Sequence, residues 1–179
     1  MSDFYTINIA GLERQLPLCK VTDNLKIAAF VMFGDVEVTI ASASALLEKL
    51  PEFDYIITPE AKSIPLAYEM SRQSKKPYFV ARKGEKVYMT SPVHVDVKSI
   101  TTNKLQTLYL DGAEGEQIRG KKVVIIDDVI STGESLRAVE ELVEGFDAKL
   151  VAKAAVLAEG DAANRSDIVF LEKLPVFFK

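Results

Sequence analysis

The sequence feature that most constrains the fold is an uninterrupted run of four β-branched residues at 123–126, followed at once by Asp127 and Asp128. A run that is apolar at every position is typical of a central strand in a parallel sheet, because helices cover both faces of such a strand. Beyond a short loop, apolar residues recur every three or four positions over 136–146, which predicts a helix with one apolar stripe. The sequence therefore predicts a strand–loop–helix unit of an α/β sheet.

The loop of this unit, Ser131-Thr132-Gly133, has the composition of an anion site. In open α/β sheets, ligands bind beyond the carboxyl ends of the strands, and the N-terminus of the next helix offers free N–H groups and partial positive charge. Gly133 lets the backbone approach a phosphate closely, and the hydroxyls of the loop and of Ser135 add donors. Two carboxylates would repel a phosphate, so we expect the aspartates to bind vicinal ribose hydroxyls or Mg²⁺.

A structural interpretation of the same residues is also open. Ser131 and Glu134 have the spacing of a capping box, in which two side chains satisfy free backbone N–H groups at a helix N-terminus. Alone, that pattern is more often structural than ligand-binding. The aliphatic run, the acid pair and the Ser-Thr-Gly-x-Ser loop together favour the ligand site.

Length and composition indicate one globular domain, residues 1–179, because the chain is long enough for one α/β domain and too short for two. It is 48% hydrophobic and 27% charged, which is ordinary for a soluble protein, and no stretch approaches the roughly 18 apolar residues of a membrane span. The N-terminus lacks a signal-peptide pattern, and the single cysteine, Cys19, excludes an internal disulfide, so we expect a cytoplasmic protein. The net charge of −4 argues against broad nucleic-acid binding.

Strand and helix patterns alternate along the chain, which predicts a doubly wound parallel sheet. Asp35 is a candidate N-cap for a helix that Pro51 ends. Residues 84–103 have little periodicity, which is typical of a functional loop, and residues 111–120 are acidic and rich in turn formers. The other expected elements are strands at 3–9, 12–18, 54–58, 77–81, 105–110, 149–158 and 167–171, and a helix at 64–71.

Residues 123–135 resemble the phosphoribosyl-pyrophosphate signature of type I phosphoribosyltransferases, in which four aliphatic residues, two acids and two aliphatic residues precede a Thr-Gly-x-Ser/Thr loop. They do not resemble a Walker A loop, because no Gly-Lys-Ser/Thr follows the strand. The resemblance implies that family's α/β fold, with a small N-terminal hood contributed mainly by about residues 1–34. It implies that Asp127 and Asp128 are catalytic and hold the ribose hydroxyls and, through ribose or water, Mg²⁺. The 5′-phosphate loop that it implies consists of Val129, Ile130, Ser131, Thr132, Gly133, Glu134 and Ser135.

Two further segments at predicted strand ends resemble the pyrophosphate-binding parts of the family. Glu60, Ala61 and Lys62 are similar to the acidic-small-basic triplet of the adenine enzymes. Arg82 and Lys83 are similar to a basic pair that contacts the diphosphate in the adenine and xanthine enzymes. A solvated turn lysine and a basic surface pair are the structural alternatives. The order of the segments before the signature favours pyrophosphate binding.

The segment from Val31 to Asp35 resembles the hydrophobic-Phe-Arg-Asp segment that shapes the base pocket of the adenine enzymes, with Gly34 in place of the arginine. The resemblance implies that Val31, Phe33 and Gly34 line the base pocket and that Phe33 stacks on a purine. A core aromatic side chain is the alternative for Phe33.

Residues 84–104 are similar to the flexible catalytic loop of the family. Residues 99–103 carry no acid where the adenine enzymes have a glutamate, and Ser99-Ile100-Thr101 is closer to the bacterial xanthine enzymes. His94, the only histidine, is either a proton carrier or an exposed loop residue.

The resemblance implies a purine salvage phosphoribosyltransferase that uses phosphoribosyl pyrophosphate, Mg²⁺ and a purine base, with adenine favoured. Xanthine or guanine is the alternative base, and a non-catalytic sensor of phosphoribosyl pyrophosphate is the alternative class of protein. The family is commonly dimeric, which implies a homodimer, with no nucleic-acid or membrane partner.

Overall fold

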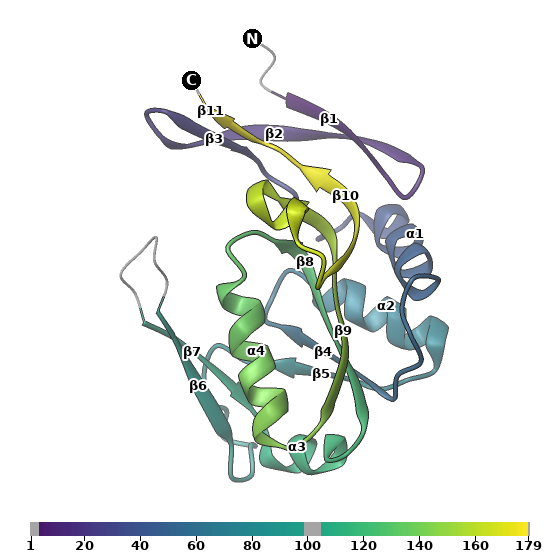
Figure 1. Ribbon diagram of the computed structural model, residues 1–179, viewed down its shortest axis with the longest axis vertical. Coiled ribbons are helices and arrows are strands. Elements are labelled where there is room, and N and C mark those ends of the chain that lie inside the picture. Colours follow the sequence, from purple (N-terminus) through teal and green to yellow (C-terminus); the bar gives the residue numbers. More distant parts are fainter. Residues whose placement is uncertain (1–3, 99–104, 179) are drawn as a thin grey trace.

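A five-stranded parallel sheet forms the centre of the computed structural model, which describes residues 4–98 and 105–178 (Figure 1). The strand order is β10-β9-β8-β4-β5, and each neighbouring pair is parallel. The strands are β4 (Tyr55–Pro59), β5 (Tyr78–Ala81), β8 (Lys122–Ile130), β9 (Lys149–Glu159) and β10 (Val169–Leu174). The predicted doubly wound parallel sheet is confirmed. None of the helices within the described residues is long and apolar enough to cross a membrane.

Helices cover both faces of β8, as its composition predicts. Helices α1 (Val36–Leu47) and α2 (Ile64–Ser74) pack on one face, and α4 (Glu134–Gly145) packs on the other (Figure 1). Successive side chains of a strand point to opposite faces. Val124 and Ile126 accordingly join the core under α1 and α2, whereas Val123 and Ile125 join the core under α4. All four are fully buried, and this strand anchors both halves of the core.

Two elements arise where the sequence predicts irregular structure. Strand β6 (Val93–Lys98) lies inside the expected loop and pairs antiparallel with β7 (Leu105–Leu110). Helix α3 (Gly112–Ile118) occupies the expected turn region, and the Asp111 carboxylate accepts a hydrogen bond from the Ala113 N–H (3.1 Å). Both predictions were wrong because these short elements depend on tertiary packing. A Cβ at Gly115 would collide with the ring of Phe146, so α3 packs closely only through a glycine.

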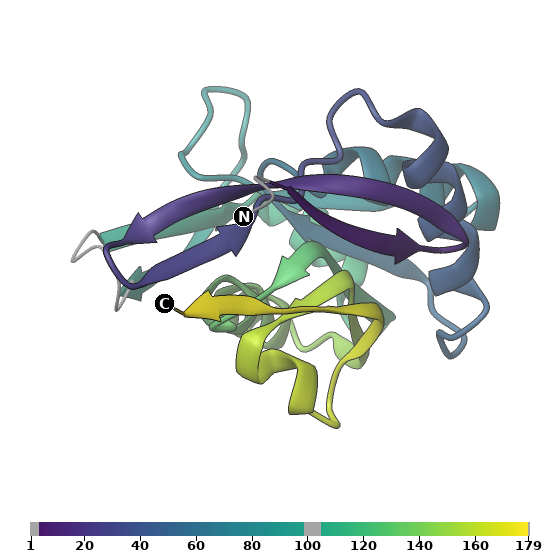
Figure 2. The same cartoon turned by 90° about the horizontal axis from the view of Figure 1, so that it is seen from above.

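A second sheet forms a hood over one end of the core (Figures 1 and 2). Its strand order is β1-β2-β3-β11, built from β1 (Phe4–Ile9), β2 (Leu12–Thr22), β3 (Leu25–Ala28) and β11 (Val176–Phe178). The two expected N-terminal strands are present. The sequence analysis missed β11, which pairs antiparallel with β3 and adds C-terminal residues to the hood.

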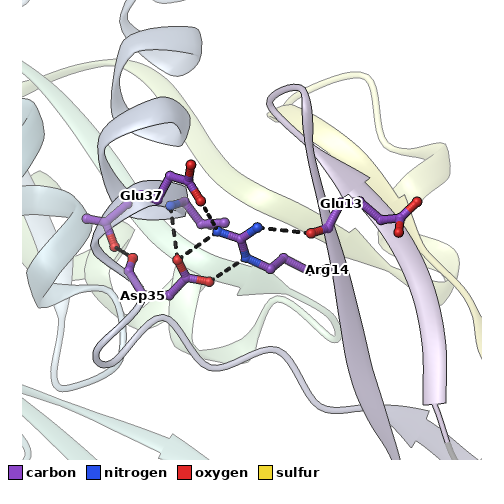
Figure 3. Close-up of polar contacts among 6 residues, drawn as sticks. Glu13, Arg14, Asp35 and Glu37 are labelled. Carbon is purple, nitrogen blue, oxygen red and sulfur yellow. Dashed lines mark hydrogen bonds and ion pairs between the residues drawn. The ribbon is translucent and has the colours of Figure 1, made fainter.

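Arg14 of β2 links the hood to the N-terminus of α1 (Figure 3). Its Nε lies 2.7 Å from Asp35 Oδ2, and its Nη2 lies 2.8 Å from Glu37 Oε2. Asp35 is also the N-cap of α1, since its Oδ1 accepts a hydrogen bond from the Val38 N–H (3.1 Å). The hydrogen bond from Arg14 holds the pKa of Asp35 below its usual range. One carboxylate therefore both begins α1 and anchors the hood.

We predict that Asp35→Ala lowers the free energy of unfolding by about 1 kcal/mol through the lost N-cap, with a further loss from the broken ion pair. Asp35→Asn keeps an acceptor for the Val38 N–H and is expected to fall between this variant and the wild type. Because the folded-state pKa of Asp35 is lowered, the ion pair contributes stability above the ordinary carboxyl pKa of about 4 and loses it as the pH falls through the lowered value.

Urea unfolding of the three proteins from neutral to acidic pH measures both contributions. The gap between wild type and Asp35→Asn should close in acid. A gap that stays constant with pH would mean that the ion pair with Arg14 contributes nothing.

Candidate active site

Strand β8 extends beyond the end of its pairing with β4, and the acid pair lies in that extension. Strand β4 is paired with β8 only as far as Ile57 and Ile125, whereas β9 follows β8 to Ile130. The hydroxyl of Thr58 donates a hydrogen bond to the carbonyl oxygen of Ile126 (2.8 Å), just beyond the last paired residues of β4 and β8. The sequence pattern places the end of the strand before the acids, but both aspartates belong to β8 and line one cavity beyond the end of its pairing with β4.

The two aspartates occupy different environments. Asp128 is buried, with 4% of its surface exposed, and its Oδ2 lies 2.8 Å from the Nζ of Lys62. Asp127 is half-buried, and its Oδ1 accepts a hydrogen bond from the Asp128 N–H (2.9 Å). Desolvation, followed by the negative charge of Asp128, raises the pKa of Asp127 well above its usual range. Two acidic groups thus lie next to each other, and Lys62 pairs with only one of them, Asp128.

Two adjoining cavities open around the acid pair. The loop cavity, about 110 Å³, is lined by Asp127 and by residues 129–136. The acid cavity, about 400 Å³, is lined by both aspartates and by residues from three other elements. Its lining is Pro59, Glu60, Ala61, Lys62, Lys83, Leu108, Asp127, Asp128, Val129 and Ser135. The cavities share Asp127, Val129 and Ser135, so one extended ligand can occupy both.

The loop after β8 has the geometry of an anion site. Gly133 is the N-cap of α4 and has a left-handed backbone (φ +83°), which glycine adopts without steric cost. No side chain caps this helix, so the capping box of Ser131 and Glu134 is wrong: Ser131 lies too far ahead of the first helical residue. Within residues 4–98 and 105–178, no hydrogen bond engages the hydroxyls of Ser131, Thr132 or Ser135, which leaves them available to a ligand.

The predicted pyrophosphate residues divide into two groups. Glu60, Ala61, Lys62 and Lys83 line the acid cavity beside the aspartates. The guanidinium of Arg82 turns elsewhere: its Nε lies 3.3 Å from Glu60 Oε2, and its Nη1 donates to the Tyr88 hydroxyl (2.7 Å). Arg82 lines a separate cavity of about 280 Å³ together with Tyr88.

Glu60 connects these two groups. Its Oε2 accepts a hydrogen bond from the Lys83 N–H (2.8 Å), which, followed by the charge of Arg82, lowers the pKa of Glu60. Arg82 therefore contacts the loop that carries Glu60 without lining the acid cavity.

The predicted base-pocket residues lie in the connection between β3 and α1. Val31 and Phe33 are about half exposed, which rules out the core alternative for Phe33 in this chain. Gly34 has a left-handed backbone (φ +82°) and lines an apolar cavity of about 240 Å³ between α1 and α2. None of the three lines the loop cavity or the acid cavity. Their role in base binding therefore stays a prediction.

The predicted catalytic loop is described only in part. His94 is exposed on β6, with its ring centroid 5.4 Å from that of Tyr109, and it lines neither the loop cavity nor the acid cavity. Residues 99–103, which lack the glutamate, lie outside the described residues.

The sequence patterns did not identify three residues near the site. Leu108 contributes an apolar wall to the acid cavity, Arg14 anchors Asp35, and Arg165 lies against Gly133. Leu108 belongs to a strand that the sequence does predict. No sequence signal marks the two arginines, because each reaches its partner across elements that are distant in the sequence.

We predict that Asp127→Asn raises the free energy of unfolding of the ligand-free protein at about pH 8, because a neutral amide replaces a carboxyl group whose ionisation the folded protein disfavours. The folded chain keeps a proton on Asp127 at pH values where the unfolded chain has lost it. Stability therefore falls as the pH rises from the ordinary carboxyl pKa, about 4, to the raised value.

Chemical unfolding at about pH 4 and about pH 8 measures the effect. The variant and the wild type should be equally stable at the lower pH and diverge at the higher one. Asp23→Asn, whose side chain is 92% exposed, is the matched control. An Asp127→Asn variant that is less stable than the wild type at the higher pH would contradict the raised pKa.

Comparison with known proteins identifies the family. The family described as phosphoribosyl transferase domain matches residues 38–177. The chain is 33% identical over 122 residues to the purine biosynthesis transcriptional repressor PurR of Bacillus subtilis (strain 168), covering 68% of this chain and 41% of the repressor. It is 36% identical over 113 residues to the hypoxanthine/guanine phosphoribosyltransferase of Methanococcus voltae, covering 63% of this chain and 56% of that enzyme. The matches thus span about half the length of these relatives.

Solved structures show the same fold. Adenine phosphoribosyltransferase from Thermoanaerobacter pseudethanolicus superposes with a TM-score of 0.73 at 18% identity, covering 88% of this chain and 95% of that one. The enzyme from Saccharomyces cerevisiae superposes with a TM-score of 0.65 at 18% identity, covering 95% and 92%. The family match over most of the chain, the shared fold and the acid pair beside a Thr-Gly-x-Ser loop lead to one conclusion: this chain belongs to the type I phosphoribosyltransferase family.

Proposed function

We propose that the protein transfers the 5-phosphoribosyl group of phosphoribosyl pyrophosphate to a purine base, forming a nucleoside 5′-monophosphate and pyrophosphate. The observation that carries this proposal is the junction of the two cavities, where the acid pair lies between the loop at 131–135 and the basic residues Lys62 and Lys83. A phosphate, a ribose and a diphosphate need those three groups in that order. We further propose that the enzyme is a cytoplasmic homodimer, as is common in the family.

Each part of the substrate has a proposed partner. Residues 129–135 hold the 5′-phosphate with backbone N–H groups and hydroxyls. Asp127 and Asp128 accept hydrogen bonds from the vicinal ribose hydroxyls. Lys62 and Lys83 face the diphosphate, whereas Arg82 supports it through Glu60.

The donor set also fits Mg²⁺. This ion usually keeps several waters and takes one or two carboxylates together with substrate phosphates. Asp127 and Asp128 supply two carboxylates at the wall of the acid cavity. When bound there with the substrate, the ion would neutralise charge on the diphosphate. Lys62, which pairs with Asp128 in this structure, has a flexible side chain that is half exposed and free to reorient toward the ligand.

The reaction exchanges a carbon–oxygen bond for a carbon–nitrogen bond and releases one proton. A purine ring nitrogen attacks the anomeric carbon, the bond from that carbon to the pyrophosphate oxygen breaks, and its electron pair leaves with pyrophosphate. The proton of the attacking ring nitrogen is lost to pyrophosphate or to solvent. Positive charge develops on the ribose ring, and the carboxylates near the ribose stabilise it. The lysines stabilise the departing negative charge, so the site places opposite charges on the two sides of the breaking bond.

The base is proposed to be adenine, because the Glu-Ala-Lys triplet and the Phe33 segment resemble the adenine enzymes. The relatives that are named as enzymes are hypoxanthine/guanine phosphoribosyltransferases, which makes those bases the main alternative, with xanthine next. Adenine presents an amine donor at position 6 and requires an acceptor, whereas the other three present a carbonyl there and require donors. A mismatch leaves a buried polar group unpaired, which costs about 1–3 kcal/mol.

A second candidate function is supported by the similarity to the PurR repressor. The chain then binds phosphoribosyl pyrophosphate as a signal and catalyses nothing, and the absence of an acid at 99–103 fits that case. Turnover separates the two functions, because a sensor binds phosphoribosyl pyrophosphate without releasing pyrophosphate.

We predict that adenine gives the highest kcat/KM in a panel with hypoxanthine, guanine, xanthine, orotate and uracil, by at least about tenfold. Pyrophosphate release in the presence of phosphoribosyl pyrophosphate and Mg²⁺ is the measurement. Preference for hypoxanthine or guanine would overturn the choice of base but not the reaction. Tight binding of phosphoribosyl pyrophosphate with no turnover on any base would overturn the enzyme and leave the sensor.

We predict that Lys62→Met and Lys83→Met weaken binding of phosphoribosyl pyrophosphate more than binding of the nucleotide product, because the product lacks the diphosphate. Arg82→Met should have a smaller effect, since its guanidinium is held by Glu60 and Tyr88. Calorimetric titration of each variant with both ligands gives the ratio of the two losses. Equal losses for the two ligands in the lysine variants would place those side chains outside the diphosphate site.

A further inference from the structure

We propose that Arg165 is an additional residue of the 5′-phosphate site and supplies the cation that binds the phosphate at the loop after β8. This inference rests on the proposed function and adds to it. Arg165 follows the short helix η1 (Gly160–Asn164), which leads out of β9. Arg165 therefore belongs to the connection that follows the neighbouring strand β9, and not to the signature segment.

The guanidinium of Arg165 lies directly against the loop. A Cβ placed on Gly133 would come within 2.7 Å of Arg165 Nη1, and apart from the two chain neighbours of Gly133 no other side chain of the described residues lies within 4 Å of that position. Gly133 is thus constrained twice, by its left-handed backbone and by the guanidinium beside it. A side chain at position 133 would push the cation away from the N-terminus of α4.

Asp167 fixes the orientation of this guanidinium. Arg165 Nε donates to Asp167 Oδ1 (2.9 Å), and Nη2 donates to Asp167 Oδ2 (2.7 Å), so one edge of the planar group is held by two parallel bonds. The same carboxylate binds Lys153 Nζ (2.6 Å), which also contacts Glu140 of α4 (3.0 Å). Lys153 and Glu140 brace Asp167 against α4, and the Nη1 edge of Arg165 is the edge that remains for the loop.

Two positive groups meet at this point. A helix N-terminus carries partial positive charge, so a cation beside it is unfavourable in the absence of a ligand. Arg165 is nevertheless held there by its pair with Asp167. Arg165 does not itself line the loop cavity, but Gly133 does, and an anion bound at that glycine would be stabilised by both positive groups and would reduce their repulsion. Among the described residues no hydrogen bond uses Nη1, and its two N–H groups match a phosphate oxygen.

The alternative is a structural role, in which Arg165 only fastens the turn between η1 and β10 (Val169–Leu174) through Asp167. The two roles differ in what they predict for ligands. A structural arginine affects phosphorylated and unphosphorylated ligands alike. A phosphate-binding arginine affects only those that carry the 5′-phosphate.

The test uses Arg165→Met, which removes the charge at similar volume, and Arg165→Lys, which keeps the charge without the planar fork. Calorimetry measures binding of ribose 5-phosphate, of the nucleotide product and of the corresponding nucleoside. Arg165→Met is expected to weaken the two phosphorylated ligands by about 10- to 100-fold and to leave the nucleoside unchanged. Arg165→Lys should recover part of the loss, and the gap to wild type should narrow at high salt.

Arg119→Met is the matched control, because Arg119 also makes paired contacts with acids, Glu116 and Asp147, whereas Arg165 is the arginine that lies against Gly133. In turnover, Arg165→Met should raise the KM for phosphoribosyl pyrophosphate and leave the KM for the base unchanged. Unchanged affinity of Arg165→Met for ribose 5-phosphate, or equal losses for nucleotide and nucleoside, would overturn the role of Arg165. A wild-type protein that binds neither ribose 5-phosphate nor phosphoribosyl pyrophosphate would overturn the proposed function as well.

Discussion

The structure depends on the burial of β8 on both faces. Its four β-branched residues contribute to two separate apolar cores, one under α1 and α2 and one under α4. Burial of that apolar surface is the main favourable term that holds the helices on the sheet. Because the strand is fixed from both sides, its next residues are held rigidly as well. The core thus fixes the positions of the acid pair, the loop and the start of α4.

The same arrangement makes the site costly in free energy. Beyond Ile126 the strand loses its neighbour β4, and two adjacent carboxylates replace the apolar run. One carboxylate is paired with Lys62, and the other has a raised pKa because burial and a like charge disfavour its ionised form. The guanidinium of Arg165 lies beside Gly133 at the N-terminus of α4, where its pair with Asp167 holds it. The proposed substrate, which carries hydroxyl groups and a phosphate, would supply partners for the carboxylates and for the guanidinium.

The local patterns of the sequence predict the central elements and the core of the site. Strand β8 and helix α4 follow from periodicity, and the aspartates, the loop and the Glu60–Lys62 segment meet because the carboxyl ends of parallel strands share one edge. Features that depend on distant partners were not predictable. Helix α3 requires Gly115 against Phe146, and β11 requires β3 as its partner. The orientation of the Arg82 side chain likewise depends on its contacts with Glu60 and Tyr88. The basic pair that Arg82 forms with Lys83 in the sequence does not indicate those contacts.

The hood has a consequence for the order of folding. Its hairpin of β1 and β2 joins adjacent segments, and such local contacts form early. Its other edge joins β3 to β11, which come from opposite ends of the sequence. Closing so long a loop is slow, and β11 emerges from the ribosome long after the strands that it joins. The core sheet takes its edge strand β10 (Val169–Leu174) from the same segment, so one short stretch of chain completes both the core sheet and the hood.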